Sequence, residues 1–301
     1  MVSPDQLEHL VTEECNPRTQ NLDLLDTSEL VRCMQGEDLE VAGSVQKEVS
    51  KIAQAVDLIV DGLSKGGRLI YFGAGTSGRL GILDASECPP TFGVELGLVS
   101  GYIAGGKQAV FETIEGAEDY EEFGEKDVMI AAIKKYDIAC GITASGRTPY
   151  VIGALRKAKE NGAYTIGVTN NEPNKIADWC DVTIAVITGP EAIAGSTRMK
   201  AGSAQKMVLN LLTSCSMVRL GKVYENLMVD MTPTNHKLKR RALAMLSLLC
   251  NLPSAQAQEA LKAADNNVKT AILMVKKQMD LEQAKKLLGK CKGSLRLALA
   301  S

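Results

Sequence analysis

The sequence predicts an α/β fold, a three-layer sandwich with a mostly parallel sheet, followed by a small helical subdomain at the C-terminal end. Two observations support this prediction. Short apolar segments alternate with helical segments as far as about residue 235, a pattern typical of a parallel sheet that helices cover on both faces. Beyond that point the strand signal disappears and only helical segments follow. The 301 residues, 45% of them apolar, are enough to build such a core.

The α/β part is expected to follow an arm. The first forty residues are polar and lack a sustained period, whereas apolar residues recur at steps of three and four from Val41 to Leu63. This spacing predicts an amphipathic helix that ends at Gly66. The strands that we expect next are residues 68–72, 96–104, 138–143, 164–169 and 182–187. The helices that we expect are a segment from about residue 79 that stops at Pro89-Pro90, then residues 108–120, 150–161 and 198–220.

The C-terminal part reads as helical throughout. The expected helices are residues 237–250, 254–264, 267–279 and 280–291. Ser254 and Asp280 are suitable N-caps, and Gln283 completes a capping box with Asp280. We therefore expect an N-terminal arm over 1–40, an α/β domain over 41–235 and a helical subdomain over 236–301.

Composition argues against several classes of function. A net charge of −2 and 4% aromatic residues provide neither a basic field nor a stacking platform for nucleic acid, and no charge that would hold the chain on an anionic membrane. No apolar run approaches the roughly 18 residues of a membrane span, and the acidic N-terminus does not resemble a signal peptide. The eight cysteines form no CxxC pair, which favours reduced thiols in the cytoplasm. Because only two histidines are present, carboxylates are the expected proton carriers.

Three loops have the chemistry of a phosphate site. Gly73, Gly75 and Gly78 fit GxGxxG, but the next strand ends without the acidic residue that a dinucleotide ribose requires, so Thr76 and Ser77 favour a phosphate monoester instead. The loops with this chemistry include residues 73–78, residues 145–148 (Ser145, Gly146, Arg147, Thr148) and the segment 195–202, which contains Ser196. In an open α/β sheet these loops can meet at the carboxyl ends of the strands. The alternative is that they are simply N-caps and tight turns.

Two sets of carboxylates are candidates for acid–base work. Pro89-Pro90 would place Glu87 at a helix C-terminus, where the negative end of the dipole favours its protonated form. Glu112, Glu115, Glu118 and Asp119 fall at helical spacing, where like charges raise one another's pKa. A solvated glutamate and an acidic surface are the alternatives, and position alone does not choose among the four acidic residues.

Five segments resemble the N-acetylmuramic acid 6-phosphate etherase family. They are GAGTSGRLGILDASECPP (73–90), IEGAED (114–119), ASGRTPY (144–150), STRMKAG (196–202) and NLMVD (226–230). The similarity runs in the family's order from about Thr12 to the C-terminus. It implies a sugar isomerase (SIS) domain of flavodoxin-like topology and C-terminal helices similar to a small ubiquitin-associated-type fold.

The same resemblance implies a function. The family cleaves the lactyl ether of N-acetylmuramic acid 6-phosphate during bacterial cell-wall recycling, giving N-acetylglucosamine 6-phosphate and D-lactate. It uses no metal or organic cofactor and forms a homodimer with sites near the subunit interface. The resemblance places the two catalytic glutamates on Glu87 and Glu118. The substrate-binding positions that we expect are Gly75, Thr76, Ser77, Ser145, Gly146, Arg147, Thr148 and Ser196.

One distance is difficult to reconcile with a single compact site. Ser77 and Glu87 are ten residues apart, or about 15 Å on an unbroken helix, which is long for a hexose phosphate. Gly81 could break the helix, the phosphate could bind mainly at 145–148, or Glu87 could serve the partner subunit's site. The rival functions are a phosphosugar sensor, such as the longer, two-domain glucokinase regulatory protein, and an aldose–ketose phosphosugar isomerase. A nucleotide-dependent oxidoreductase is a more distant alternative.

Overall fold

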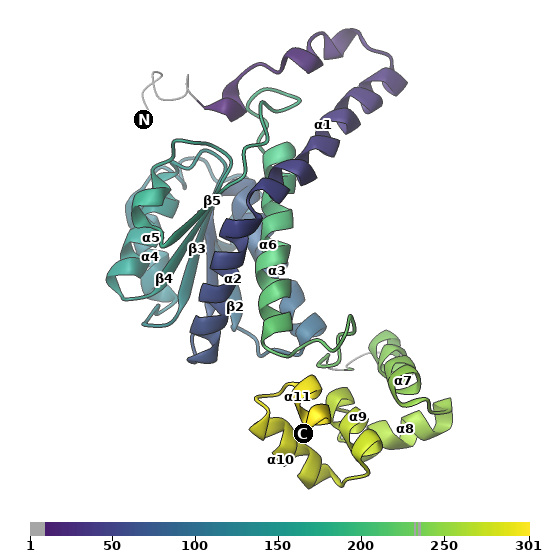
Figure 1. Cartoon of the computed structure of the whole chain (residues 1–301). Helices are drawn as coiled ribbons and strands as arrows, with labels where there is room; N and C mark the ends of the chain where they lie inside the picture. Colours follow the sequence, from purple (N-terminus) through teal and green to yellow (C-terminus); the bar gives the residue numbers. More distant parts are fainter. Residues whose placement is uncertain (1–9, 232, 234–235) are drawn as a thin grey trace. The chain divides into compact units, whose positions relative to one another are not determined.

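The computed structural model describes residues 10–231, 233 and 236–301 (Figure 1). The chain divides into two compact units. Unit 1 comprises Met1–Ser86 and Gly97–Thr213, and unit 2 comprises Glu87–Leu96 and Ser214–Ser301.

Unit 1 is built on a five-stranded sheet. Its strands are β1 (Leu69–Gly73), β2 (Val99–Ile103), β3 (Ile138–Thr143), β4 (Tyr164–Thr169) and β5 (Val182–Ala185). Their order is β2-β1-β3-β4-β5, and all four pairings are parallel. This is the doubly wound order of flavodoxin-like folds, so the predicted α/β class is confirmed. Because the chain proceeds to β2 on one side of β1 and returns to β3 on the other, the carboxyl ends of β1 and β3 form the switch point where such folds bind ligands.

Helices cover both faces of the sheet (Figure 1). Alternate residues of β1 face opposite sides, as the period of a strand requires. Ile70 and Phe72 pack in a core with α4 (Glu121–Ile130) and α5 (Pro149–Glu160). Tyr71 faces α3 (Gly75–Phe92), where its hydroxyl donates to Asp84 at 2.9 Å. On that same face lie α2 (Val49–Ser64) and α6 (Lys200–Arg219).

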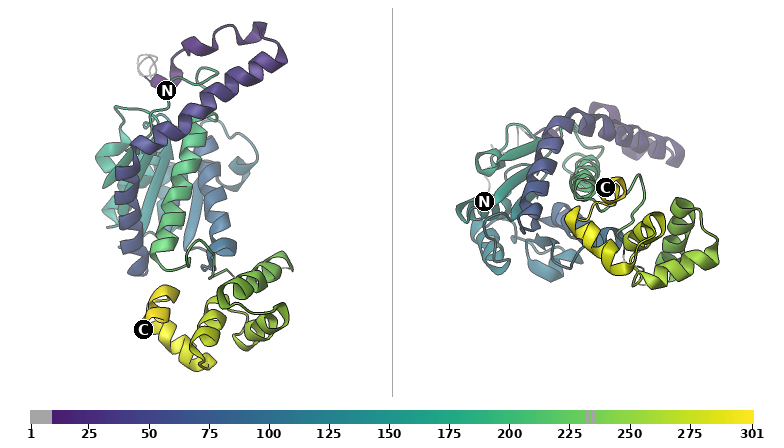
Figure 2. Two further views of the ribbon diagram at one scale, coloured as in Figure 1. Left: turned by 45° about the vertical axis from the view of Figure 1, so that its right-hand side comes forward. Right: turned by 60° about the horizontal axis from the view of Figure 1, so that its bottom comes forward.

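The single helix predicted from Val41 to Leu63 is two helices, and the first begins well before Val41, in the region expected to be an arm. After 3-10 turns at Val11–Glu13, Pro17–Thr19 and Leu22–Leu24, helix α1 spans Thr27–Lys47 and is separated from α2 only at Glu48. A capping box between Asp26 and Glu29 begins α1. Apolar residues of α1 before Val41, such as Val31 and Leu39, are exposed, so no buried stripe produced a helical period there. Figure 2 shows α1 extending beyond the carboxyl ends of the strands.

The prediction that Pro89-Pro90 stop the third helix was wrong. Helix α3 begins inside the glycine motif at Gly75 and continues through both prolines to Phe92. The glycines allow this early start because a Cβ at Gly78 would lie 2.6 Å from Ile103 Cγ1, so only a glycine lets the helix approach β2 so closely. The prolines lie near the end of α3, where Cys88 and Phe92 are buried. Gly81 does not break the helix.

The helix predicted over residues 108–120 was also wrong. A 3-10 turn spans Gly106–Val110, an irregular loop follows, and α4 begins only at Glu121. Gly116 has a φ of 73°, which a regular helix excludes. Arg79 holds the loop in place by donating to the carbonyls of Val110 at 2.9 Å and Glu112 at 3.1 Å. The four acidic residues of this segment therefore do not share a helix face.

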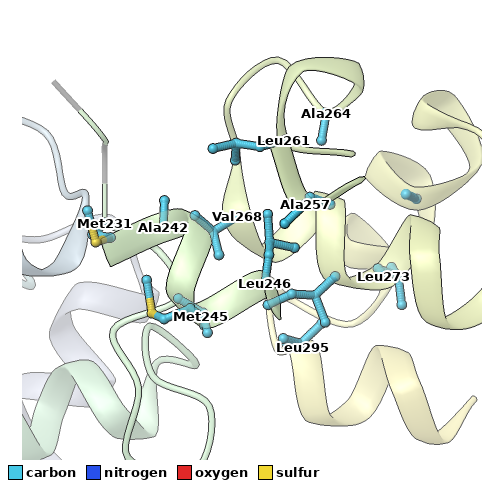
Figure 3. Packing of buried hydrophobic residues seen from close by; sticks show 14 of the residues in the cluster. Met231, Ala242, Met245, Leu246, Ala257, Leu261, Ala264, Val268, Leu273 and Leu295 are labelled. Carbon is cyan, nitrogen blue, oxygen red and sulfur yellow. The ribbon is translucent and has the colours of Figure 1, made fainter. Parts of the chain in front are cut away.

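Unit 2 has its own core. Its helices are α7 (His236–Cys250), α8 (Ser254–Ala263), α9 (Val268–Lys277), α10 (Leu281–Lys290) and α11 (Leu295–Ala300), the last of which was not predicted. Residues from all five helices, including Leu246, Leu261 and Leu295, belong to one buried cluster, part of which Figure 3 shows. The Asp280–Gln283 capping box is confirmed. Ser254 is not an N-cap, because Pro253 occupies that position and Ser254 is the first helical residue.

Within unit 1, a buried charge network joins the N-terminal region to the start of α6. Glu37 of α1 is 3% exposed and accepts from Lys200 Nζ at 2.7 Å and from Asn16 Nδ2 at 2.8 Å. It also pairs with the Arg18 guanidinium, and Lys200 itself is fully buried. The hydrogen bonds from Arg18 outweigh the effect of burial and, together with those from Lys200 and Asn16, lower the pKa of Glu37 to about 2.

This network predicts a specific pH dependence of stability. A folded-state pKa below the ordinary value of 4.5 stabilises the protein at pH values above 4.5, and the stabilisation disappears as the pH falls toward 2. The difference corresponds to roughly 3 kcal/mol. Urea unfolding midpoints at pH 5 and pH 3 should therefore differ less in Glu37→Gln than in the wild type. Glu40→Gln, which changes an exposed carboxylate on the same helix, should keep the wild-type difference; an equal change in both variants would contradict the assignment.

Candidate active site

A cavity of about 380 Å³ lies at the switch point of the sheet. Its walls come from the β1–α3 connection, the β3–α5 connection, the loop before α4, the N-terminal segment and Thr197. The volume is within the range typical of small-molecule sites. A second hollow of about 520 Å³ is bounded largely by apolar side chains, including Ile114, Tyr120 and Phe123, and by none of the three serine- and threonine-rich loops.

The β1–α3 connection brings a helix N-terminus to the cavity. Gly75, Thr76 and Ser77 line the wall and form the first turn of α3, whose N–H groups have no partners within the helix. Ser77 is 8% exposed, and its hydroxyl donates to Gln205 Oε1 at 2.8 Å. Gln205 in turn donates to Asn170 Oδ1 at 2.9 Å. The Ser77 hydroxyl is thus engaged within the protein, and the first turn presents mainly N–H groups and the positive end of the helix dipole.

The β3–α5 connection supplies a cluster of hydroxyl groups. Thr148 lies 2.7 Å from Thr143 Oγ1, which is also 3.3 Å from Ser145 Oγ. Ser145 Oγ accepts from the Arg147 N–H at 3.2 Å, and Ser145, Arg147 and Thr148 all line the cavity. The N-terminus of α5 follows directly at Pro149.

Glu118 lies in the wall beside these groups. The Tyr150 N–H, in the first turn of α5, donates to the Glu118 carbonyl at 3.0 Å and so fixes its backbone to the β3–α5 connection. Glu118 is exposed as a whole residue, but partial desolvation of its carboxyl in the cavity wall raises the pKa of that group, and the charge of adjacent Asp119 raises it further. All four acidic candidates line a neighbouring hollow with Arg79, but of the four only Glu118 and Asp119 also line this cavity.

Three predicted site residues do not line the cavity within the part of the chain that the structure describes. One of them is Gly146, which has a φ of 67° and at which a Cβ would lie 2.4 Å from Asn174 Cβ. Glycine at this position therefore allows the loop to pack closely against Asn174. Ser196 belongs to the turn before α6, where its carbonyl accepts from the Met199 N–H. Glu87 is exposed and belongs to unit 2. Because α3 continues past it to Phe92, the expected position of Glu87 at a helix end was wrong.

The cavity also contains residues that sequence reasoning missed. Leu10, Thr12 and Glu13 reach it from the N-terminal segment, and Thr143 and Thr197 reach it from the loops. Gln205 was missed because it acts through Ser77. Thr143 is the last residue of a predicted strand and directly precedes the hydroxyl-rich loop, so its position in the sequence could have predicted a place in the site. Nothing in the local pattern around Glu13 indicates a contact with a loop more than a hundred residues away.

Two further searches covered the described residues. None of their helices combines the length and apolar character that crossing a bilayer requires. No group of three or more histidine, cysteine, aspartate or glutamate side chains among them is arranged to hold a metal ion. All eight cysteines are free thiols.

Comparison with known proteins gives extended similarity. The chain is 49% identical over 295 residues to an N-acetylmuramic acid 6-phosphate etherase of Clostridioides difficile (strain 630), covering 98% of this chain and 97% of that protein. It is 51% identical over 293 residues to an N-acetylmuramic acid 6-phosphate etherase of Caldanaerobacter subterraneus subsp. tengcongensis, covering 97% and 96%. Residues 51–159 match the family described as the glucokinase regulatory protein N-terminal SIS domain. A phosphoheptose isomerase from Francisella tularensis aligns with a TM-score of 0.48 at 16% identity, covering 64% of this chain and all of that one.

Proposed function

This chain belongs to the N-acetylmuramic acid 6-phosphate etherase family, and we propose that it cleaves the D-lactyl ether of N-acetylmuramic acid 6-phosphate, releasing D-lactate and N-acetylglucosamine 6-phosphate. Identity near 50% over nearly the whole length supports the assignment. The structural observation that carries it is the cavity at the switch point, where the α3 N-terminus and a hydroxyl cluster lie beside Glu118. The enzyme would act in the breakdown of amino sugars from peptidoglycan.

The phosphate of the substrate would bind between the α3 N-terminus and the β3–α5 connection. The proposed ligands are the N–H groups of Gly75, Thr76 and Ser77, the hydroxyls of Ser145 and Thr148, and the side chain of Arg147. Gly146 keeps the loop tight, and Ser196 supports the turn that presents Thr197. Because the Ser77 hydroxyl already donates to Gln205, most of the hydroxyl contacts would come from residues 145–148.

The chemistry requires proton transfers rather than direct displacement. Opening the sugar ring exposes a C1 aldehyde that acidifies the proton on C2. A base removes this proton, the C3–O bond breaks, and an acid protonates the departing lactate oxygen; water then adds back, placing hydroxyl on C3 and a proton on C2. Two carboxyl groups in different environments can supply these steps. We assign Glu118 to the proton on C2 and Glu87 to the lactate oxygen, without an added metal or organic cofactor.

We further propose that the enzyme is a cytoplasmic homodimer whose subunits share their sites. Leu83 and Glu87 are four residues apart on α3 and therefore lie on one helix face. Leu83 is 50% exposed in the single chain, and a partner subunit would cover it and receive Glu87. We also propose that residues 41–235 form the phosphosugar domain, with 1–40 as an arm and 236–301 as a helical subdomain. We expect neither nucleic acid nor membrane as a partner.

The raised pKa of Glu118 predicts a pH profile for the enzyme. A base must be ionised, so lactate release should fall on the acid side at a pH above the ordinary pKa of 4.5. Removing the neighbouring charge with Asp119→Asn should lower the pKa of Glu118 and move this acid limb to lower pH. The measurement is kcat/KM for lactate release between pH 4 and 8. Glu122→Gln is the control, and a shift equal to that of Asp119→Asn would contradict the local origin.

The first test of the function is the reaction itself. Purified protein without added metal or nucleotide should release one D-lactate for each N-acetylmuramic acid 6-phosphate consumed. No release, with the sugar phosphate still raising the melting temperature, would instead favour a phosphosugar sensor. Interconversion of an aldose and a ketose phosphate without lactate release would favour an isomerase.

A further inference from the structure

The N-terminal segment is built into the wall of the cavity. Thr12 is 1% exposed and is held through two of its groups. Its carbonyl accepts from the Gly195 N–H at 3.1 Å, and its hydroxyl accepts from Asn171 Nδ2 at 3.0 Å. Leu10, the residue that begins the turn, is 2% exposed. This segment is therefore fixed against the loop before α6 rather than lying free over the site.

Asn171 connects this segment to the proposed phosphate loop. The side-chain nitrogen that donates to Thr12 also donates to the Ala144 carbonyl at 2.9 Å. Ala144 directly precedes Ser145, and Asn171 is 1% exposed. One buried amide group thus sets the distance between the N-terminal segment and the β3–α5 connection, so the residue that follows Thr12 has a defined position at the cavity.

That residue is Glu13, which lines the cavity. Its N–H donates to the Leu10 carbonyl at 2.9 Å, which closes the turn. Its carboxylate lies over Gly195, where a Cβ would come within 2.9 Å of Glu13 Oε2. Glu13 makes none of the side-chain hydrogen bonds or ion pairs found within the described part of the chain. Glu13 is an exposed residue that lines the cavity, so its carboxylate is available to a ligand bound there.

We propose that Glu13 is a substrate-binding residue that accepts hydrogen bonds from the neutral donor groups of the sugar, its hydroxyls or its acetamido N–H. A carboxylate only accepts hydrogen bonds. The two ends of the substrate, a phosphate and a lactyl carboxylate, are anionic and would be repelled by it. The hydroxyl and amide groups between them are the donors that remain. This inference deepens the function proposed above and depends on the same cavity.

The test compares two neighbouring glutamates. Glu13→Ala should raise KM for N-acetylmuramic acid 6-phosphate and lower kcat/KM about 10- to 100-fold, the range expected for losing a hydrogen bond to a charged group. Glu13→Gln, which keeps an acceptor oxygen, should fall between alanine and wild type. Glu14→Ala, an exposed neighbour that does not line the cavity, should behave like the wild type. Wild-type kinetics for Glu13→Ala would overturn the proposal.

Binding measurements separate this inference from the function itself. With N-acetylglucosamine 6-phosphate as the probe, Glu13→Ala should lose affinity, whereas its affinity for inorganic phosphate should match the wild type. Equal losses for both probes would mean that Glu13 only supports the loop, and would also overturn the proposal. If the wild type bound the sugar phosphate but released no lactate, the etherase function would fail while the comparison of the two probes still decided the role of Glu13.

Discussion

Replacing Glu118 with glutamine should lower kcat/KM for D-lactate release by about 10³-fold or more. The variant keeps the size of the side chain but cannot take a proton, and acid–base groups contribute about 10²–10⁴-fold to such reactions. The Glu118 carbonyl still accepts from Tyr150, so the fold should be retained. Steady-state kinetics and a melting curve check both parts. Glu122→Gln, an exposed carboxylate in the first turn of α4, should retain activity.

Isotope exchange identifies which step Glu118 performs. In deuterated water the wild type should incorporate deuterium at C2 of N-acetylglucosamine 6-phosphate. Glu118→Gln should lose this exchange together with lactate release, because removal of the C2 proton precedes loss of the ether. Deuterium exchange at C2 of the unreacted N-acetylmuramic acid 6-phosphate, with lactate release lost, would instead assign Glu118 to protonation of the leaving oxygen.

The fold could be predicted from the sequence wherever a segment is buried by regular neighbours. The strands gave short apolar runs because both faces of the sheet are covered, and all five formed close to their predicted positions. The part of α1 before Val41 was not predicted because its apolar residues are exposed and give no buried stripe. The helix begins instead at a local capping box. The helix predicted over residues 108–120 was wrong because the prediction used only the helical spacing of the acidic residues. That spacing does not reveal the positive φ of Gly116, 73°, which is incompatible with a regular helix.

The candidate site could be predicted only in part, for a related reason. Loops that follow strands carry recognisable signals, and the parallel order brings Thr76 and Ser145 to one cavity. Glu13 depends on hydrogen bonds from Asn171 and Gly195, each more than 150 residues away in the chain. Such contacts leave no periodic trace. The extension of α3 through two prolines likewise depends on packing rather than on local preference.

Replacing Glu87 with glutamine should also abolish D-lactate release, but by blocking a different step. If Glu87 protonates the lactate oxygen, the variant should keep deuterium exchange at C2 of the bound substrate while the ether remains intact. Glu95→Gln, an exposed carboxylate in the segment after α3, serves as the control and should keep both activities. Loss of both exchange and release in Glu87→Gln would contradict the proposed division of roles.

The continuous helix makes the subunit that receives Glu87 a testable question. Ten residues of unbroken α3 separate Ser77 from Glu87, about 15 Å at 1.5 Å per residue, and Gly81 does not shorten that path. A dimer isolated with one Glu87→Gln subunit and one Glu118→Gln subunit therefore distinguishes two arrangements. If sites are shared, one site contains both native glutamates, and about half of the wild-type rate should return. If each site uses its own subunit, every site lacks one glutamate and the mixed dimer should be as inactive as either parent. A monomer in solution would exclude sharing and require Glu87 to act within its own chain.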